Sequence, residues 1–169
     1  MKSAKLLTLT ALFAALVCVV TAYVGHIPVG TLGGYVHFGD ACIFLAASFL
    51  PMPYAMAAAS VGAGLADLLS GAPHWIIPTV IIKSIMVTAL TSKKETVLCA
   101  RNAIGAVIAS VIGIVGYYIA ESLMLGNWIV PLAGIPMGGA VQAVGGLVMY
   151  AVIGIVMDKT RVKSRLKRL

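Results

Sequence analysis

The sequence predicts an all-α integral membrane protein, a bundle of six transmembrane helices with both termini in the cytoplasm. The first observation is composition: of 169 residues, 61% are hydrophobic and only 10% are charged, whereas a soluble domain carries about 25% charged residues. Such a chain cannot cover a water-facing surface of its own, which excludes a soluble globular enzyme and a disordered chain. The second is a series of six apolar runs, and the third is the clustering of basic residues between them.

The apolar runs predict six helices in a single membrane domain, residues 1–169, because about 20 apolar residues span a bilayer. A retained first helix is favoured over a cleaved signal peptide, since its run is long and no Ala-x-Ala site follows it. The predicted helices lie at approximately 4–24, 38–50, 54–70, 75–91, 101–126 and 136–158, followed by a basic cytoplasmic tail at 159–169.

Each break between these helices has a local cause. The Gly-rich loop 25–37 ends the first helix, and Pro51 and Pro53 separate the second from the third. A turn at 70–75 and a polar stretch at 92–101 bound the fourth helix, and residues 126–136 lead through two prolines into the sixth. The apolar runs at 41–50 and 76–90 are short for a bilayer core of about 30 Å. Either these helices extend into their polar flanks, or the loops at one face dip into the membrane.

The basic residues predict the orientation. With six spans, 11 of the 12 Lys and Arg residues fall on the side that holds both termini, and Lys83 is the exception. The positive-inside rule makes that side cytoplasmic. The net charge of +7 therefore reports topology rather than nucleic-acid binding, and contact of the basic tail with lipid headgroups is the better interpretation.

Ionisable residues inside the predicted spans indicate a functional site, since they are costly in a membrane. By helical rise, Asp67, Lys83, Glu121 and Gln142 lie roughly 6–12 Å from the outer turns, and Asp40 begins its helix at the same face. The inner half is predicted to be almost purely apolar. This pattern indicates a polar pocket that faces outward and lies above an apolar inner half. A channel, in contrast, would carry polar residues through both halves of the bundle.

Structural roles compete with these assignments. Asp40 is a candidate helix cap, and Asp67 and Lys83 are a candidate ion pair. Trp75 and Trp128 are also compatible with an interfacial aromatic belt. Tyr117 and its neighbour Tyr118 are compatible with simple packing. His37 and Asp40 have spacing i, i+3, but two ligands do not make a metal centre, and no metal site is predicted.

Two stripes of small residues are a further signal. One follows the first helix and the other the fifth, and both have spacings that let membrane helices approach closely. Internal packing and docking on another membrane protein remain alternatives for both. The stripes are Ala4, Thr8, Ala11, Ala15, Cys18 and Ala22, and Gly105, Ala109, Gly113, Gly116 and Ala120.

The sequence contains no catalytic signature. It has no HExxH, P-loop or GxSxG motif, so no enzyme activity is predicted and the chain cannot drive transport with ATP by itself. Its three cysteines show no CxxC spacing, which favours inert buried thiols and gives no support for a zinc site or disulfide framework. No cofactor is predicted.

Several segments together resemble the substrate-binding S-components of energy-coupling factor (ECF) vitamin transporters. They cover nearly the whole chain and are Gly34-Tyr-Val-His-Phe-Gly-Asp40, Gly64-Leu-Ala-Asp-Leu-Leu-Ser-Gly71, Pro78-Thr-Val-Ile-Ile-Lys83, Tyr117-Tyr-Ile-Ala-Glu121 and Gly126-Asn-Trp128. The resemblance implies a six-helix subunit of a prokaryotic plasma membrane that binds a vitamin or its precursor from outside. It also implies as partners a membrane scaffold subunit and two ATPases.

The resemblance assigns roles to individual residues. Ala11 and Ala15 match the Ala-x-x-x-Ala motif with which the family docks on its scaffold, and the loop 25–37 corresponds to the cap over the pocket. The predicted substrate-binding residues are Tyr35, His37, Asp40, Asp67, Trp75, Lys83, Tyr117, Glu121, Asn127, Trp128 and Gln142.

The pyridoxine- or hydroxymethylpyrimidine-like branch looks closest. The Asn-rich stretch of many of its relatives is absent after Pro136, however, which keeps pantothenate-like and queuosine-precursor-like ligands as candidates. The alternative function is a self-sufficient small secondary transporter or channel.

Overall fold

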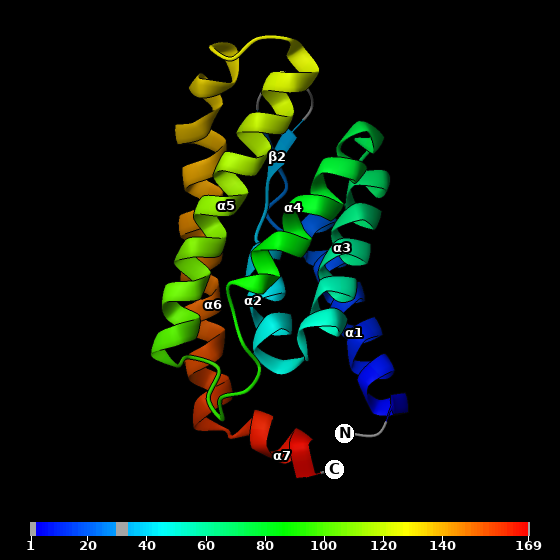
Figure 1. Ribbon diagram of the computed structural model, residues 1–169, viewed down its shortest axis with the longest axis vertical. Coiled ribbons are helices and arrows are strands. Elements are labelled where there is room, and N and C mark those ends of the chain that lie inside the picture. The colour runs from blue at the N-terminus through cyan, green and yellow to red at the C-terminus, as the bar shows by residue number, and fades with distance from the viewer. Residues whose placement is uncertain (1–2, 30–33, 169) are drawn as a thin grey trace.

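The computed structural model describes residues 3–29 and 34–168 as a helical bundle with one short hairpin (Figure 1). Lys2 and residues 30–33 of the predicted capping loop lie outside the described residues. The helices and strands are α1 (Ser3–Tyr23), β1 (Ile27–Val29), β2 (Gly34–Val36), α2 (Gly39–Phe49), α3 (Met52–Leu69), η1 (Pro73–Trp75), α4 (Ile76–Thr88), α5 (Ala100–Leu125), η2 (Val130–Ala133), η3 (Ile135–Ala140), α6 (Val141–Lys159) and α7 (Val162–Arg168).

The prediction of an all-α membrane protein is confirmed. Among the described residues, four helices are long and apolar enough to cross a membrane: α1, α3, α5 and the continuous helix Gly138–Lys159. Large apolar side chains on their outer faces are exposed, for example Leu12, Ile104 and Leu123 at 62%, 62% and 68%, as expected for a lipid-facing surface. The helices Gly39–Phe49 and Pro73–Thr88 are apolar but shorter.

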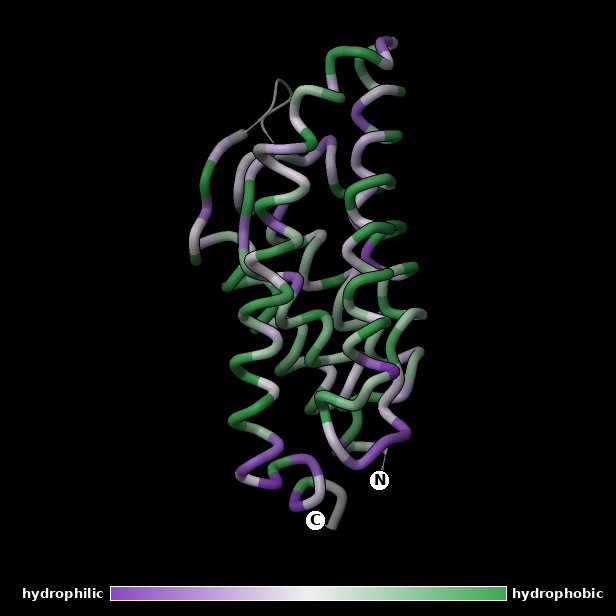
Figure 2. The backbone as a smooth tube through the Cα atoms, turned by 90° about the vertical axis from the view of Figure 1, so that its left-hand side faces the viewer, coloured by the Kyte–Doolittle hydropathy of each residue, from purple (hydrophilic) through white to green (hydrophobic). Residues whose placement is uncertain are grey.

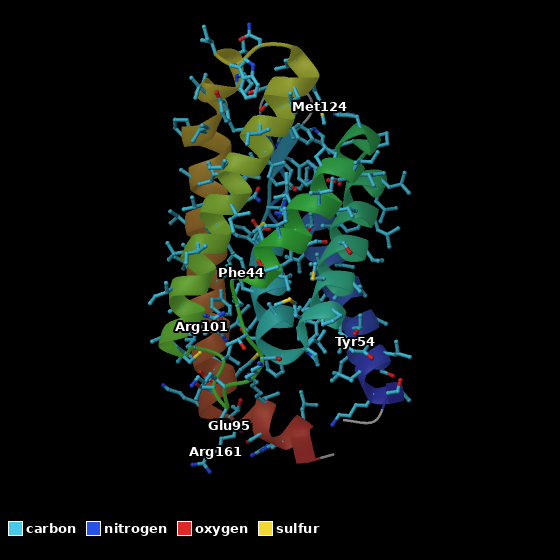
Figure 3. The ribbon with its side chains drawn as sticks, in the orientation of Figure 1. Phe44, Tyr54, Glu95, Arg101, Met124 and Arg161 are labelled. Carbon is cyan, nitrogen blue, oxygen red and sulfur yellow. The ribbon has the colours of Figure 1, made fainter. Side chains whose placement is uncertain are left out.

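Hydrophobic residues predominate along the helices of the bundle (Figure 2). Hydrophilic residues gather at the end that carries both termini, where Glu95, Arg101 and Arg161 lie, and Met124 is near the opposite end (Figure 3). The Lys5 ammonium donates a hydrogen bond to the carbonyl of Leu166, which ties the start of α1 to α7.

Local sequence explains where the helices begin and end. Pro51 and Pro53 start α3, because proline fits the first helical turn, where no intrahelical donor is needed. Gly126 ends α5 in the left-handed conformation, with φ of 63°. Three features differ from the prediction: the loop 25–37 contains a β-hairpin, the last transmembrane helix begins with π-helical turns at Ile135–Ala140, and the basic tail forms α7.

A buried polar network lies near the terminal end, where the sequence predicted an almost purely apolar interior. Asn102 is fully buried, and its side chain bonds Ser48 Oγ and both the N–H and the carbonyl of Thr91. The Tyr150 hydroxyl donates to the carbonyl of Val97 at 3.0 Å. The prediction of a purely apolar inner half is wrong because the loop between α4 and α5 enters the bundle there, and its buried backbone groups need partners.

The two small-residue stripes have different roles. The α5 stripe faces α4: a Cβ on Gly116 would lie 2.9 Å from Ile82, and one on Gly113 3.4 Å from Met86. In the α1 stripe, Cys18 and Ala22 are buried. The terminal half of that stripe, comprising Ala4, Thr8, Ala11 and Ala15, is exposed. Internal packing therefore accounts for the α5 stripe but leaves the terminal half of the α1 stripe uncovered.

The contact between α1 and α3 depends on Gly62, where a Cβ would lie 2.5 Å from the carbonyl oxygen of Ala14. We expect Gly62→Val to separate the helices and to cost about 1–3 kcal/mol, the usual effect of overpacking. Ala57→Val, at an exposed position of the same helix, is the matched control. Thermal unfolding in detergent measures both; equal stabilities would show that α1 and α3 tolerate a wider spacing.

Candidate functional site

A buried ion pair forms the base of the candidate site. Lys83 Nζ of α4 lies 2.5 Å from Asp40 Oδ1 of α2, and the two residues are 1% and 5% exposed. Gln142 of α6 donates from Nε2 to Asp40 Oδ2 at 2.9 Å. Both carboxylate oxygens are thus bonded, and one side chain links three helices.

These contacts decide between the structural alternatives. Asp40 lies in the first turn of α2, as the helix-cap interpretation expects, but its carboxylate bonds Lys83 and Gln142, so an N-terminal role is not its only one. Asp67 does not form the predicted ion pair with Lys83, because Asp40 reaches the ammonium instead. The sequence could not distinguish these pairings, since all three residues were expected at similar depth.

The hairpin covers Asp67. Its strands pair Ile27 with Val36 and Pro28 with Tyr35, and the Tyr35 hydroxyl donates to Asp67 Oδ1 at 2.8 Å. The other carboxylate oxygen, Oδ2, is buried and has no hydrogen-bond partner among the described residues. The hairpin therefore contacts the Asp67 carboxylate through the Tyr35 hydroxyl and leaves Asp67 Oδ2 beneath it as a hydrogen-bond acceptor.

Stacked rings stiffen this cover. The Tyr35 ring stacks on His26, with centroids 4.0 Å apart, and tilts against His37 at 5.5 Å. His37 Nδ1 accepts a hydrogen bond from the N–H of Gly39, so that nitrogen is occupied and the weak His37–Asp40 metal interpretation gains no support. The nitrogen that accepts this bond carries no proton, so the His37 imidazole is neutral in this arrangement.

Trp75 and Tyr117 form an aromatic wall in the site. The Trp75 indole meets the Tyr117 ring edge-on, with centroids 5.7 Å apart. Thr79 and Tyr117 share a hydrogen bond of 3.0 Å between their hydroxyls, and the Lys83 ammonium lies 5.0 Å from the centre of the Tyr117 ring. Rings held in this way offer flat apolar faces for stacking on a planar ligand.

The hairpin, Asp40 and the aromatic wall line a partly open cavity of about 130 Å³. Of the predicted site residues, eight line it: Tyr35, His37, Asp40, Asp67, Trp75, Tyr117, Glu121 and Gln142. Lys83 lies behind Asp40 and does not reach the cavity wall. The π-helical turns contribute Gly138 and Gly139 to the lining, and a Cβ on Gly139 would lie 3.3 Å from Ile114 of α5. Such turns often occur at functional sites.

Two predicted residues lie elsewhere. Asn127 Oδ1 accepts hydrogen bonds from the N–H groups of Ile129 and Val130, so it forms the turn after α5. Trp128 is 52% exposed and packs its edge against Tyr118. The prediction that Asn127 and Trp128 contact the substrate disagrees with this placement. Gly126 ends α5, and both residues belong to the turn that follows it, outside the cavity lining.

Three further polar residues line the cavity that were not among the predicted site residues: Thr79, Ser110 and Tyr118. Thr79 precedes Lys83 by four residues and Ser110 precedes Tyr117 by seven, so each lies on the same helical face as a residue that was predicted. This spacing could have identified both. Tyr118 offered no comparable signal beyond its position next to Tyr117.

The chain is similar to known sequences over most of its length. The family described as "ECF-type riboflavin transporter, S component" matches residues 1–159. An uncharacterized protein in a gap 3′ region of Pyrococcus woesei is 29% identical over 149 residues, which covers 83% of this chain and 93% of that relative. No solved structure matches.

The ion pair yields a stability prediction. Lys83→Met would leave Asp40 charged and buried without its partner, and we expect a loss of about 3–5 kcal/mol in unfolding free energy. Adding Asp40→Asn should restore part of it by removing the uncompensated charge. Ile85→Met, at an exposed position of the same helix, controls for the methionine. Thermal unfolding of the four proteins tests this; an unaltered Lys83→Met midpoint would contradict it.

Proposed function

The chain belongs to the family of ECF-type riboflavin transporter S components, and from this we propose that it captures a single-ring vitamin or vitamin precursor from outside the cell. The family makes it a substrate-binding subunit of a vitamin transporter rather than an enzyme. It also implies a small-molecule substrate and partnership with an ECF scaffold and ATPase modules. The proposal adds the location of the site, the kind of substrate and the orientation in the membrane.

The observation that carries the proposal is the partly open cavity at the end of the bundle away from the termini. Its lining combines hydrogen-bonding groups, among them Asp67, Glu121 and Gln142, with the rings of Trp75 and Tyr117. A flat ring with polar substituents fits such walls: stacking holds its faces, and polar pairing discriminates among its substituents.

The cavity size favours a small substrate. A water molecule needs about 10–15 Å³ in this measure, so 130 Å³ accommodates roughly ten non-hydrogen atoms. A pyridoxine- or hydroxymethylpyrimidine-like ring is of that order. Riboflavin, after which the family is named, is the second candidate. Its three fused rings and side chain would require the hairpin to move outward.

We place both termini in the cytoplasm of a prokaryotic cell, with six helices crossing the plasma membrane. The described basic residues other than Lys83 lie at or near the terminal end, which supports this orientation. At 1.5 Å per residue, α2 measures about 16 Å and Pro73–Thr88 about 24 Å, so these helices are short. The hairpin and the turn at 70–72 would complete those spans, which is tolerated where protein surrounds the backbone.

The exposed half of the α1 stripe is the proposed docking surface for the scaffold. Ala11 and Ala15 present small side chains on an uncovered face, and such faces allow close helix–helix approach in a membrane. The α5 stripe is already packed within the subunit and does not compete for this role.

A self-sufficient transporter would need a polar route below the cavity. The buried polar groups there, Ser48, Asn102 and Tyr150, bond to one another or to the loop backbone. Their role is thus accounted for by loop anchoring. Uptake into proteoliposomes that contain this subunit alone would support the alternative.

The test of substrate capture is mass spectrometry of whatever small molecule co-purifies, followed by titration of ligand-free protein with pyridoxine, hydroxymethylpyrimidine and riboflavin. We expect a single-ring compound to bind and Glu121→Ala to weaken it at least tenfold, because Glu121 lines the cavity. Asn127→Ala, outside the cavity, should bind normally. Tighter binding of riboflavin would favour the second candidate.

For docking, we expect Ala11→Phe or Ala15→Phe to abolish uptake by the complete transporter and to leave ligand binding intact, because the bulky ring keeps the scaffold helix at a distance. Leu12→Phe, at a 62% exposed position of the same helix, should support uptake. Co-purification with scaffold and ATPase subunits gives a direct readout. Loss of ligand binding with preserved assembly would make the stripe a packing feature.

A further inference from the structure

The charges on the cavity wall are unbalanced. Three carboxylates line it, Asp40 from α2, Asp67 from α3 and Glu121 from α5, whereas no Lys or Arg occurs among the described lining residues. His37 also lines the cavity, but its Nδ1 accepts a hydrogen bond from the N–H of Gly39, so the ring is neutral in this arrangement. His26 and His74 are not part of the lining.

Lys83 contacts one of these carboxylates directly, that of Asp40. Its ammonium contacts Asp40 Oδ1 from behind the wall and is 1% exposed, so it offers no cation to a ligand. Gln142 donates to the second oxygen of Asp40. The Asp40 carboxylate is therefore bonded at both oxygens within the protein.

The two carboxylate oxygens of Asp67 differ in their hydrogen bonding. Its Oδ1 accepts from the Tyr35 hydroxyl, but its Oδ2 is buried without a hydrogen-bond partner among the described residues, in a side chain that lines the cavity. A buried acceptor without a donor costs free energy. A ligand that brings a donor to Oδ2 recovers this cost, whereas a ligand that brings a second acceptor increases it.

The rings on the wall favour the same class of ligand. Trp75, Tyr117 and Tyr118 line the cavity, and aromatic faces attract cations through their negative quadrupole. Carboxylates in a cavity of low dielectric act in the same direction, since opposite charges attract more strongly there than in water.

We propose that the site selects a cationic or amine-bearing nitrogen heterocycle and rejects ligands that carry a carboxylate. This inference rests on the proposed function, since it specifies the substrate of the same cavity. It excludes the pantothenate-like candidate. Among single-ring compounds, it predicts that the form with an amine substituent binds more tightly than the form with an alcohol. Asp67 Oδ2 is the acceptor assigned to the ligand's N–H.

The test compares matched sets of ligands on one ring. Purified, ligand-free protein is titrated with pyridoxamine, pyridoxine and pyridoxate, and with the aminomethyl, hydroxymethyl and carboxyl forms of an aminopyrimidine. We expect the amine to bind at least about tenfold more tightly than the alcohol, and the carboxylate not to bind. Equal or tighter binding of a carboxylate, no binding by any amine, or an anionic co-purified ligand would overturn the proposal.

Isosteric variants locate the effect. Asp67→Asn keeps the shape but removes the charge, and we expect it to reduce the preference for amine over alcohol by at least about fivefold. Asn127→Asp adds a carboxylate outside the cavity and should leave the preference unchanged; a preference equal in Asp67→Asn and wild type would remove Asp67 from this role. Assembly with the scaffold and ATPases is measured separately, so a wrong ligand charge and a failure of the transport function give different results.

Discussion

The buried contact between Asp40 and Lys83 holds the outer half of this bundle together. It joins α2 to α4, and Gln142 extends it to α6, so the floor of the cavity is bonded across three helices. Two charges removed from water must be paired closely, and that requirement fixes the relative depth of the short helices. The aromatic wall depends on the same pair, because the Lys83 ammonium also lies against the Tyr117 ring.

The opposite end of the bundle is organised by hydrogen bonds without a buried ion pair among the described residues. Asn102, Ser48 and Tyr150 bond to one another or to the loop after α4, and Asp158 accepts from the N–H groups of Val97 and Leu98. The loop is thereby anchored beneath an apolar core centred on residues such as Phe44 and Met86. The molecule thus has a polar cavity at one end and an anchored loop at the other, with apolar packing between them.

Much of the fold could be predicted from sequence because the membrane imposes a simple rule on composition. Long apolar runs gave the helices of α1, α3 and α5, and proline and glycine marked their ends near Pro51 and Gly126. The hairpin, the π-helical turns and α7 could not be predicted, since they depend on contacts of short segments with the rest of the bundle. Tyr35, for instance, is held by His26 and Asp67, which are remote from each other in sequence.

For the site, residue type and depth identified Asp40, Asp67, Glu121 and Gln142 as a group, because ionisable or amide side chains are rare inside apolar runs. What the sequence alone determined is therefore the class of protein, the approximate helices and the level of the polar site. Only the tertiary structure decided that Lys83 pairs with Asp40, that Asp67 retains an open acceptor, and that Asn127 and Trp128 lie outside. Depth along a helix follows from residue spacing, whereas pairing depends on how the helices rotate and pack against one another.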